Sequence, residues 1–358
     1  MKDTREIAEG NGFRAHDAAQ FTNTGDRKVK AIQFSEAGAA KDVLKMVDID
    51  AVEPGPNEVR VKIAYAVVNP TDAKRRSSGR ELPNFSPIVS GNDGAGVIEA
   101  VGSNIDPNQI GKNVWIFGAQ AGRPMGTAAE YCTLPSWMAP RLPERATLLD
   151  GACLGVPAVT AYYSVFSDGP VEGKTVLISG GAGRVGAYAV QIAKLGGATV
   201  IAMVGKPENE AYARELGADH VVNYKSDDVA RKVLELTGGR GVDQVSEVAF
   251  GANVDLFPQI VAPNGVIAAY SSDAVAEPVL PFLPLMFKNI TMRPFTIYSL
   301  TEATKRDIFD AINGMLAKDQ LKHRIGAHHP FTLDGVIAAH EMIEADASAG
   351  VCVIDIAG

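Results

Sequence analysis

The chain has 358 residues, of which 46% are hydrophobic and 21% are charged, the balance of an ordinary globular protein and not of a disordered or fibrous one. This length favours two domains. The formal net charge of −8 argues against a nucleic-acid or anionic-membrane partner, because such partners require a basic surface.

The three cysteines are widely spaced and odd in number, so neither a disulfide framework nor a cysteine-rich zinc site is indicated, and we expect a reducing, cytoplasmic location. Residues 1–27 lack an apolar core and carry several acids, so we interpret them as an N-terminal tail and not as a secretory signal. The apolar stretch 278–287 is broken by prolines and falls short of the ~20 residues of a membrane span.

Short alternating strands fill the chain from Val29 onward, separated by Pro, Gly and Asn turns. They lie at 28–38 (KVKAIQFSEAG), 57–68 (NEVRVKIAYAVV) and 93–102 (DGAGVIEAVG). This pattern predicts an all-β region.

Beyond about Pro157 the pattern alternates between strands and helices. Strands are predicted at 175–180, 198–205, 220–224, 242–248, 265–271 and 289–295, and helices at 184–196, 208–217, 226–237 and 252–262. Such alternation is typical of a doubly wound parallel sheet, so the predicted fold is α/β.

The C-terminal part holds a helix at 302–318, a turn at 328–335 (HHPFTLDG), a helix at 333–345 and a strand at 350–358. These segments have no partners of their own. We therefore expect them to return to the first domain.

A glycine cluster follows the first strand of the alternating region. In SGGAGRVG, Gly180, Gly183 and Gly186 have a spacing close to the dinucleotide-binding fingerprint, although not identical with it. Gly180 allows the tight turn, Gly183 lets backbone amides approach a pyrophosphate at a helix N-terminus, and Gly186 allows close packing. Because the loop follows a strand and opens a helix, the sequence predicts a dinucleotide site.

The end of the second strand of this region indicates which dinucleotide binds. It reads Val204–Gly205–Lys206, without the acid that binds the ribose of NAD. A lysine would attract a 2′-phosphate, so NADPH is favoured over NADH. Tyr224 could supply a second contact. The alternative is that Lys206 only caps a strand in solvent.

The chain resembles the zinc-free branch of the medium-chain dehydrogenase/reductases, specifically the zeta-crystallin-like quinone oxidoreductases and the alkenal/enone reductases. The motifs that carry the resemblance are VVNPTDAKRRSSG, SGNDGAGVIEAVG, GTAAEY, GVPAVTAYYSV, VLISGGAGRVGAYAVQIAKLGGATVIA and LGADHVVNY. The resemblance implies a GroES-like β-rich catalytic domain (28–156 with 297–358), a Rossmann domain (157–296), an active site between them, and usually a homodimer joined through the last Rossmann strand.

The resemblance also implies that no metal is bound. Where the zinc branch has its ligands, this chain has Asn69, Asn92 with Asp93, and Val156, which are not soft ligands. The histidines do not replace them. His328 and His329 are adjacent and would point apart in an extended chain. The others are expected to be surface or cap residues: His16, His220, His323 and His340.

Without a metal, the hydride acceptor is expected to be a small molecule that is already electrophilic, either a quinone or an α,β-unsaturated carbonyl. The resemblance places Asn69 where the cleft is lined against both nicotinamide and substrate, so Asn69 is a candidate for cofactor binding and for catalysis. It places Lys74 where quinone reductases of this type commonly carry tyrosine and plant-type enone reductases carry lysine, so Lys74 is a candidate catalytic residue. Lys74 would stabilise an enolate oxygen or bind an acidic substrate. The alternative is that Lys74, Arg75 and Arg76 form a solvated basic turn.

Further residues are predicted to bind the cofactor. The resemblance places Thr160 and Ser271 near the nicotinamide, although both could equally be structural hydroxyls. The remaining candidates are Ala182, Arg184, Val185 and Phe250. One departure is that the C-terminal segment DASAGVCVID lacks the basic residue that quinone reductases often carry there.

Several alternatives remain open at this level. Reduction of an enoyl or acryloyl thioester would need a basic patch, for which the candidates are Lys74, Arg75, Arg76 and Arg80. A non-catalytic NADPH-binding protein is the third reading. The segment 117–131 is either a gating loop or a long surface connection, and 281–287 (PFLPLMF) lines the pocket, a dimer interface or both.

Overall fold

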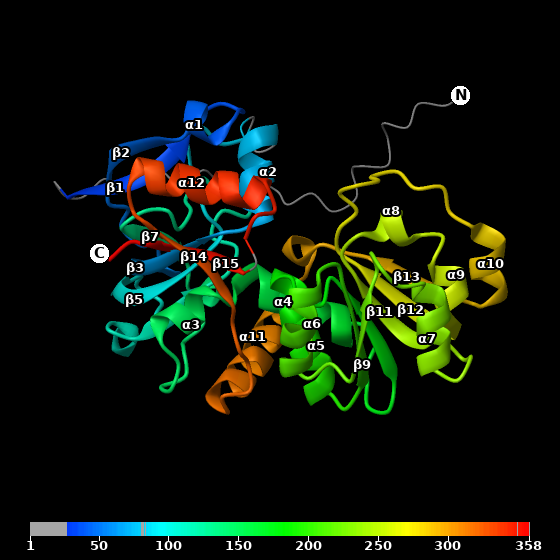
Figure 1. Cartoon of the computed structure of the whole chain (residues 1–358). Helices are drawn as coiled ribbons and strands as arrows, with labels where there is room; N and C mark the ends of the chain where they lie inside the picture. Colours follow the sequence, from blue (N-terminus) through cyan, green and yellow to red (C-terminus); the bar gives the residue numbers. More distant parts are fainter. Residues whose placement is uncertain (1–26, 80–81, 83, 349, 358) are drawn as a thin grey trace, which may run out of the picture.

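The computed structural model describes residues 27–79, 82, 84–348 and 350–357. The expected tail, apart from Arg27, lies outside the described residues, as does Arg80. Two parts lie side by side in Figure 1, a β-rich part and a layered α/β part. In the described ranges, no helix combines the length and apolarity needed to cross a bilayer.

A parallel sheet of six strands forms the α/β part, in the order β10-β9-β8-β11-β12-β13. Its strands are β8 (Thr175–Ser179), β9 (Thr199–Val204), β10 (His220–Asn223), β11 (Val242–Glu247), β12 (Val261–Ala269) and β13 (Thr291–Pro294). The chain moves outward from β8 to β10, then returns to β11 on the other side of β8. This confirms the predicted doubly wound sheet.

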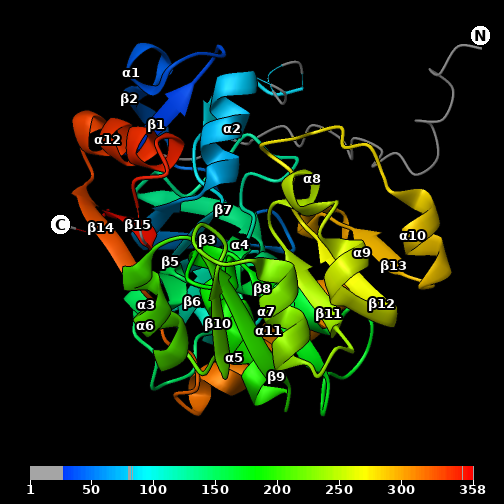
Figure 2. The same cartoon turned by 45° about the vertical axis from the view of Figure 1, so that its right-hand side comes forward.

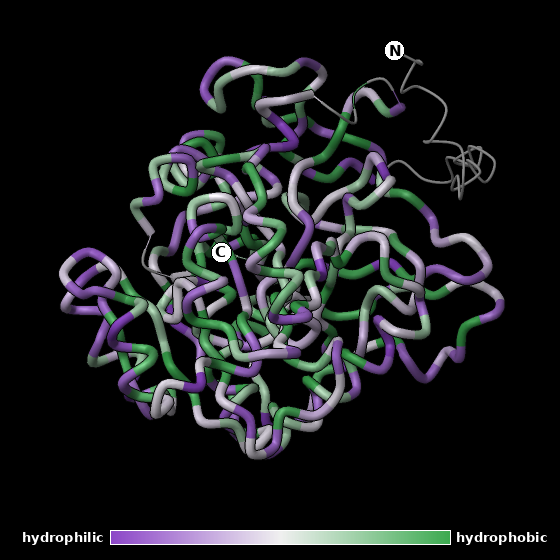
Figure 3. The backbone as a smooth tube through the Cα atoms, turned by 90° about the vertical axis from the view of Figure 1, so that its right-hand side faces the viewer, coloured by the Kyte–Doolittle hydropathy of each residue, from purple (hydrophilic) through white to green (hydrophobic). Residues whose placement is uncertain are grey.

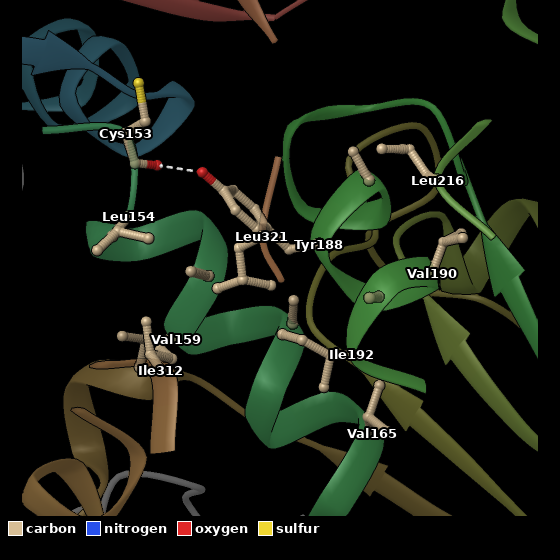
Figure 4. Packing of buried hydrophobic residues seen from close by; sticks show 14 of the residues in the cluster. Cys153, Leu154, Val159, Val165, Tyr188, Val190, Ile192, Leu216, Ile312 and Leu321 are labelled. Atoms are coloured by element: carbon tan, nitrogen blue, oxygen red, sulfur yellow. Dashed lines mark hydrogen bonds between the residues drawn. The ribbon is translucent and has the colours of Figure 1, made fainter. Parts of the chain in front are cut away.

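Helices cover both faces of this sheet because its strands are apolar on both sides. Val176 and Ile178 belong to the core on one face, whereas Leu177 belongs to the core on the other. The first face carries α4 (Gly155–Phe166), α5 (Arg184–Leu195) and α6 (Pro207–Glu215), and α11 (Glu302–Ala317) packs on α4. The second carries α7 (Val229–Leu236), α9 (Phe257–Ile260) and α10 (Phe282–Phe287). Figure 4 shows the packing on the first face.

The β-rich part contains two sheets with a core between them. The larger has β14 (Ile325–Pro330), β15 (Val351–Asp355), β3 (Glu58–Val68), β5 (Asp93–Val101), β6 (Asn113–Ile116) and β7 (Tyr131–Pro135); the smaller has β2 (Lys45–Asp50), β1 (Lys28–Phe34) and β4 (Ile88–Val89). Cys352 of β15 lies opposite Val68 of β3, so the C-terminal segment joins the N-terminal sheet.

The remaining elements are short, apart from two helices that pack together on the β-rich part, α2 (Pro70–Ser78) and α12 (Leu333–Glu344) (Figures 1 and 2). The others are α1 (Ala40–Val43), α3 (Leu148–Ala152), α8 (Phe250–Asn253) and the 3-10 turns Pro107–Gln109, Ser136–Met138 and Ile297–Ser299. Helix α4 runs across residue 156/157, where the domain boundary is predicted.

Two predicted elements are wrong. The helix expected at 252–262 is divided into α8 and α9, and the strand β12 already begins at Val261. Pro258 explains the break, since proline cannot donate the backbone hydrogen bond that a continuing helix needs. The turn expected at 328–335 begins later, because His328 and His329 lie in β14, paired with Val353 and Ile354 of β15.

Candidate active site

The glycine loop joins the end of β8 to the start of α5, where the strand order changes direction. Gly180 has φ +64°, in the left-handed region that glycine tolerates. A Cβ on Gly186 would lie 2.1 Å from the Gly180 carbonyl oxygen, so the first turn of α5 packs directly on the loop. A Cβ on Gly180 would lie 3.2 Å from Val248, just beyond β11. The carboxyl ends of β8 and β11 thus flank the crevice in which such sheets bind ligands.

The N-terminus of α5 faces this crevice with small residues. Gly183 is exposed and caps α5, and its N–H donates to the Gly180 carbonyl over 2.8 Å. Ala182 is buried beside it. The amides of Arg184 and Val185 belong to the first helical turn, which lacks intrahelical partners and carries partial positive charge. This arrangement suits a phosphate group.

Arg184 adds a cation at the same helix end. Burial lowers the pKa of its guanidinium, while Asp346 acts in the opposite direction. The guanidinium lies 3.9 Å from the Asp346 carboxylate, an acid that follows α12. Asp346 belongs to the C-terminal segment in which the sequence lacks the expected basic residue.

Lys206 and Tyr224 lie close together beyond the ends of β9 and β10. Lys206 is the exposed N-cap of α6. A Cβ on Gly205 would lie 2.3 Å from the Tyr224 hydroxyl, so the tyrosine ring lies against the residue before Lys206. Tyr224 is 51% exposed and Lys206 is also exposed, so both residues lie at the surface, where a ligand can reach them.

Phe250 and Ser271 meet at the carboxyl ends of β11 and β12, where the Phe250 N–H donates to the Ser271 carbonyl over 3.1 Å. The Phe250 ring is partly buried and packs on Phe257 of the core. Glu247 is buried at this strand end and accepts from Asn253, and burial raises its pKa. The sequence analysis missed Glu247, although an acid at the end of an apolar strand is a recognisable signal.

Four short polar side chains form a buried cluster where α2 meets β5: Asn69, Asp72, Asn92 and Asp93. The Asn69 side-chain amide donates to Asp93 Oδ2 over 2.7 Å, and that of Asn92 donates to Asp72 Oδ1 over 2.6 Å. Asp72 Oδ2 also accepts the Asn69 N–H over 2.7 Å and so caps α2. Both amide side chains are therefore held in fixed orientations.

Burial raises the pKa of Asp72 to about 6 and that of Asp93 to about 7. The charge of Asp72 raises the pKa of Asp93 further. Asp93 Oδ2 accepts the Val156 N–H over 2.6 Å, and the Thr160 hydroxyl donates to the Val156 carbonyl over 2.6 Å. One carboxylate thus connects the predicted site residues Asn69 and Thr160.

Helix α2 presents different residues to its two sides. The Thr71 hydroxyl lies 3.2 Å from that of Tyr298, and Lys74 Nζ lies 2.6 Å from both carboxylate oxygens of Asp273, which follows β12. Arg75 contacts Asn92 and the Gln120 carbonyl. The sequence analysis missed Tyr298 and Asp273, because nothing in the local pattern identifies residues some 200 positions from α2 as its partners.

Arg76 points to the opposite side of α2. It is fully buried and contacts Glu344 and the Gly38 carbonyl. The alternative of a solvated basic turn is therefore wrong, since residues 70–78 are helical and Arg76 is not solvated. The basic patch considered for a thioester substrate also loses Arg76.

The segment 117–131 is buried over 117–120 and 126–129 and reaches the surface over 121–125, so the alternative of a surface connection holds only for its middle. Phe117, Gln120 and Ala129 are buried. The Thr127 hydroxyl donates to the Asp93 carbonyl over 2.7 Å, which anchors the segment beneath the cluster.

The histidines lie in different environments, and His220 is partly buried at the start of β10. His328 and His329 point to opposite sides of β14, as expected. His340 is fully buried, with its pKa lowered to about 3 by burial, and His323 contacts Tyr188 and Asp150, so the surface assignment of both is wrong. His16 lies outside the described residues. Within the described ranges, no group of three or more His, Cys, Asp or Glu side chains is placed to hold a metal.

Comparisons with known proteins agree with this architecture. A model described as "Alcohol dehydrogenase GroES-like domain" matches residues 55–144, and one described as "Zinc-binding dehydrogenase" matches residues 185–314. These two domains together define a medium-chain dehydrogenase/reductase. The "Quinone oxidoreductase" of Pseudomonas aeruginosa is 30% identical over 91% of this chain and 99% of its own length.

Solved structures extend the comparison. A mycobacterial protein "complexed with NADPH" is 28% identical, with a TM-score of 0.78 over 91% of this chain and 99% of that one. An "NAD-dependent alcohol dehydrogenase" is 27% identical, with a TM-score of 0.82 over the same shares. The chain belongs to the zeta-crystallin-like quinone oxidoreductase family of the medium-chain dehydrogenase/reductases, as the sequence motifs predict.

Proposed function

We propose that this protein is an NADPH-dependent reductase that delivers hydride to a quinone or to an α,β-unsaturated carbonyl without a metal ion. The observations that carry the proposal are the glycine loop where the strand order reverses between β8 and β11, the pair Lys206 and Tyr224 beyond β9 and β10, and the fixed side-chain amide of Asn69 in the β-rich part. Membership of the quinone oxidoreductase family supports the class of acceptor.

The residues present fit a dinucleotide. The backbone of the glycine loop occupies the space that a Cβ on Gly186 would need, so α5 begins directly beside the loop. The backbone amides of the first turn of α5 would therefore bind the pyrophosphate. Lys206 and Tyr224 would hold a 2′-phosphate, which supports NADPH over NADH. The buried hydroxyl of Thr160 and the backbone at Ser271 would border the nicotinamide end.

NADPH, when bound, supplies the hydride and leaves as NADP⁺. The acceptor gains this hydride together with one proton from solvent, giving a hydroquinone or a saturated carbonyl. Asn69 would orient the acceptor, because Asp93 holds the side-chain amide of Asn69 in place. Lys74 would stabilise negative charge on the acceptor oxygen once the Lys74 ammonium has separated from Asp273. Asn69 and Asn92 stand at positions where the zinc-dependent branch has its zinc ligands. Their buried side-chain amides donate to the carboxylates of Asp93 and Asp72, which supports a metal-independent reaction.

A homodimer through the edge of the parallel sheet is part of the proposal. β13 is the last strand of the sheet, and exposed apolar side chains gather in the preceding segment: Val275, Val279, Leu280, Phe282, Leu283, Met286 and Phe287. Figure 3 faces this side of the molecule. An apolar patch beside an edge strand is a favourable surface for a second copy of the chain.

The test is loss of NADPH absorbance with the purified protein and 1,4-naphthoquinone, a small enone or an acryloyl thioester, with NADH as the cofactor control. Turnover of the quinone or the enone with NADPH is the expected result. Preference for the thioester would replace the proposed acceptor class. Absence of turnover with every acceptor would leave only a binding role for the protein.

A further inference from the structure

One ion pair joins the two parts of the molecule at the edge of the candidate site. Lys74 and Asp273 are 199 residues apart in the sequence, and Lys74 Nζ lies 2.6 Å from each carboxylate oxygen of Asp273. Lys74 belongs to α2, and Asp273 belongs to the segment that leaves the carboxyl end of β12. Their side chains are 54% and 66% exposed. The pair therefore lies at a solvent-accessible rim and not in the core.

The position of the pair relates it to the crevice. Lys74 is one helical turn beyond Thr71, on the side of α2 that contacts Tyr298. Asp273 is two residues beyond Ser271, whose carbonyl accepts the Phe250 N–H where β11 and β12 end. In Figure 2 the segment after β12 runs beside α2. The pair thus borders the crevice on the side of α2.

The three consecutive cations of α2 have different environments. Arg75 contacts Asn92 and the Gln120 carbonyl, and Arg76 is buried against Glu344. Lys74 is the exposed one, and its charge is balanced by Asp273. Because an exposed ion pair is weak, a ligand with negative charge can compete with Asp273 for the ammonium group.

We infer that Asp273 is a specificity-determining residue, an internal counter-ion that occupies Lys74 and makes the site favour neutral acceptors over anionic ones. An anionic acceptor must displace the Asp273 carboxylate in order to bind at the ammonium. A neutral acceptor binds without displacing it and needs the ammonium only when negative charge develops on its oxygen during hydride transfer. The inference rests on the proposed function for the place where the acceptor binds.

Binding of naphthalene-2-sulfonate, which the protein cannot reduce, tests the inference without turnover. Calorimetric titration with and without NADPH compares the wild type with Asp273→Asn, Lys74→Met and the double variant. Asp255→Asn removes an exposed carboxylate elsewhere and is the matched control.

Asp273→Asn should bind the sulfonate about fivefold more tightly than the wild type, the change typical of an exposed ion pair. Asp255→Asn should leave the affinity unchanged, and the gain should disappear when Lys74 is also replaced. Equal affinity of Asp273→Asn and Asp255→Asn overturns the inference, as does a gain that persists in the double variant.

Turnover gives a second readout. The ratio of kcat/KM for 1,4-naphthoquinone-2-sulfonate to that for 1,4-naphthoquinone should rise about fivefold in Asp273→Asn. Comparing the same two acceptors in each variant cancels their difference in intrinsic reactivity. Turnover with an unchanged ratio overturns the inference and leaves the proposed function intact. No turnover in any variant removes the proposed function, while the titration still decides whether Asp273 controls access of anions to Lys74.

Discussion

The side-chain amide of Asn69 donates to Asp93 across 2.7 Å, in a part of the molecule where neither side chain reaches solvent. The same carboxylate oxygen accepts the Val156 N–H, and Asp93 Oδ1 lies 3.4 Å from the Gly118 nitrogen. A Cβ on Gly155 would lie within 2.3 Å of the carboxylate, so α4 is packed directly against it. Asp93 therefore sets the position of Asn69 relative to α4.

Replacing Asp93 by Asn should lower kcat at least tenfold and destabilise the protein by about 1–3 kcal/mol, because one buried donor loses its acceptor. The deficit should depend on pH. Burial raises the pKa of Asp93 to about 7, above the ~3.9 of an unfolded aspartate, so the folded wild type binds the proton more tightly.

The stability that this carboxyl group contributes in the wild type is present below pH ~4 and is lost as the pH rises to about 7. Urea unfolding at pH 5, 6.5 and 8 measures the free energies of unfolding of both proteins. The deficit of Asp93→Asn should shrink toward pH 8. A deficit that grows with pH would contradict the role of burial.

Replacing Lys206 by Ala should weaken NADPH binding about tenfold and leave NADH binding unchanged, because NADH lacks the 2′-phosphate. Fluorescence titration with each cofactor measures both affinities. Lys41→Ala, at an exposed lysine on α1, is the matched control. Equal loss for both cofactors would show that Lys206 does not recognise the 2′-phosphate.

Replacing Gly186 by Ala should weaken cofactor binding, whereas replacing Gly314 by Ala should stabilise the protein. At Gly186 the new Cβ would meet the Gly180 carbonyl oxygen at 2.1 Å, and backbone must shift, so cofactor affinity should fall at least tenfold. At Gly314, inside α11, no atom lies within 4 Å of the Cβ position, so alanine should stabilise the protein by about 0.5–1 kcal/mol. Thermal unfolding and cofactor titration of both variants provide the measurements. Unchanged cofactor affinity in Gly186→Ala would remove the loop from the site.

Replacing Asp150 by Asn should cost about 1 kcal/mol at pH 7, a figure reduced by the partial exposure of this side chain. The hydrogen bond with His323 and those from Thr147 hold the pKa of Asp150 well below its usual range. The His323 ring also lies 2.8 Å from the Tyr188 hydroxyl, which donates to the Cys153 carbonyl (Figure 4).

The contribution of Asp150 is present above the unfolded pKa of ~3.9 and is lost as the pH falls through the depressed folded value. Urea unfolding at pH 7 and pH 3.5 should show the difference between wild type and Asp150→Asn becoming smaller at the lower pH. Asp310→Asn, at an exposed position on α11, should leave the free energy of unfolding unchanged at both pH values. A constant difference would argue against a stabilising hydrogen bond between Asp150 and His323.

Replacing Phe282 and Phe287 by Ser should convert the proposed dimer to a monomer, because these rings are 64% and 79% exposed beside β13 in the single chain. Sedimentation velocity measures the change. Replacing the exposed Leu195 and Leu236 by Ser is the matched control and should leave the mass unchanged. A wild type that sediments as a monomer would rule out the proposed dimer.

Much of the fold was predictable because its signals are local. The six parallel strands follow apolar runs, and the glycine loop has the spacing that a strand-to-helix turn requires. The predictions failed where the outcome depends on distant partners or on a single residue. Pro258 divides a predicted helix, and the first residues of the turn predicted at 328–335 belong to β14, because β15 provides a strand partner.

For the candidate site, the sequence identifies the elements of its cofactor half, whereas the environment of its acceptor half depends on tertiary contacts. The sequence by itself determined the βα alternation, the glycine loop and the absence of an acid before Lys206, because each depends on residues within one βα unit. Only the tertiary structure decided that Asp93 orients Asn69, that Arg76 is buried, and that Asp273 neutralises Lys74. Those relationships depend on which segments pack together. The residues that neutralise or bury a charged side chain are its neighbours in the folded structure, and these lie far from it in the sequence.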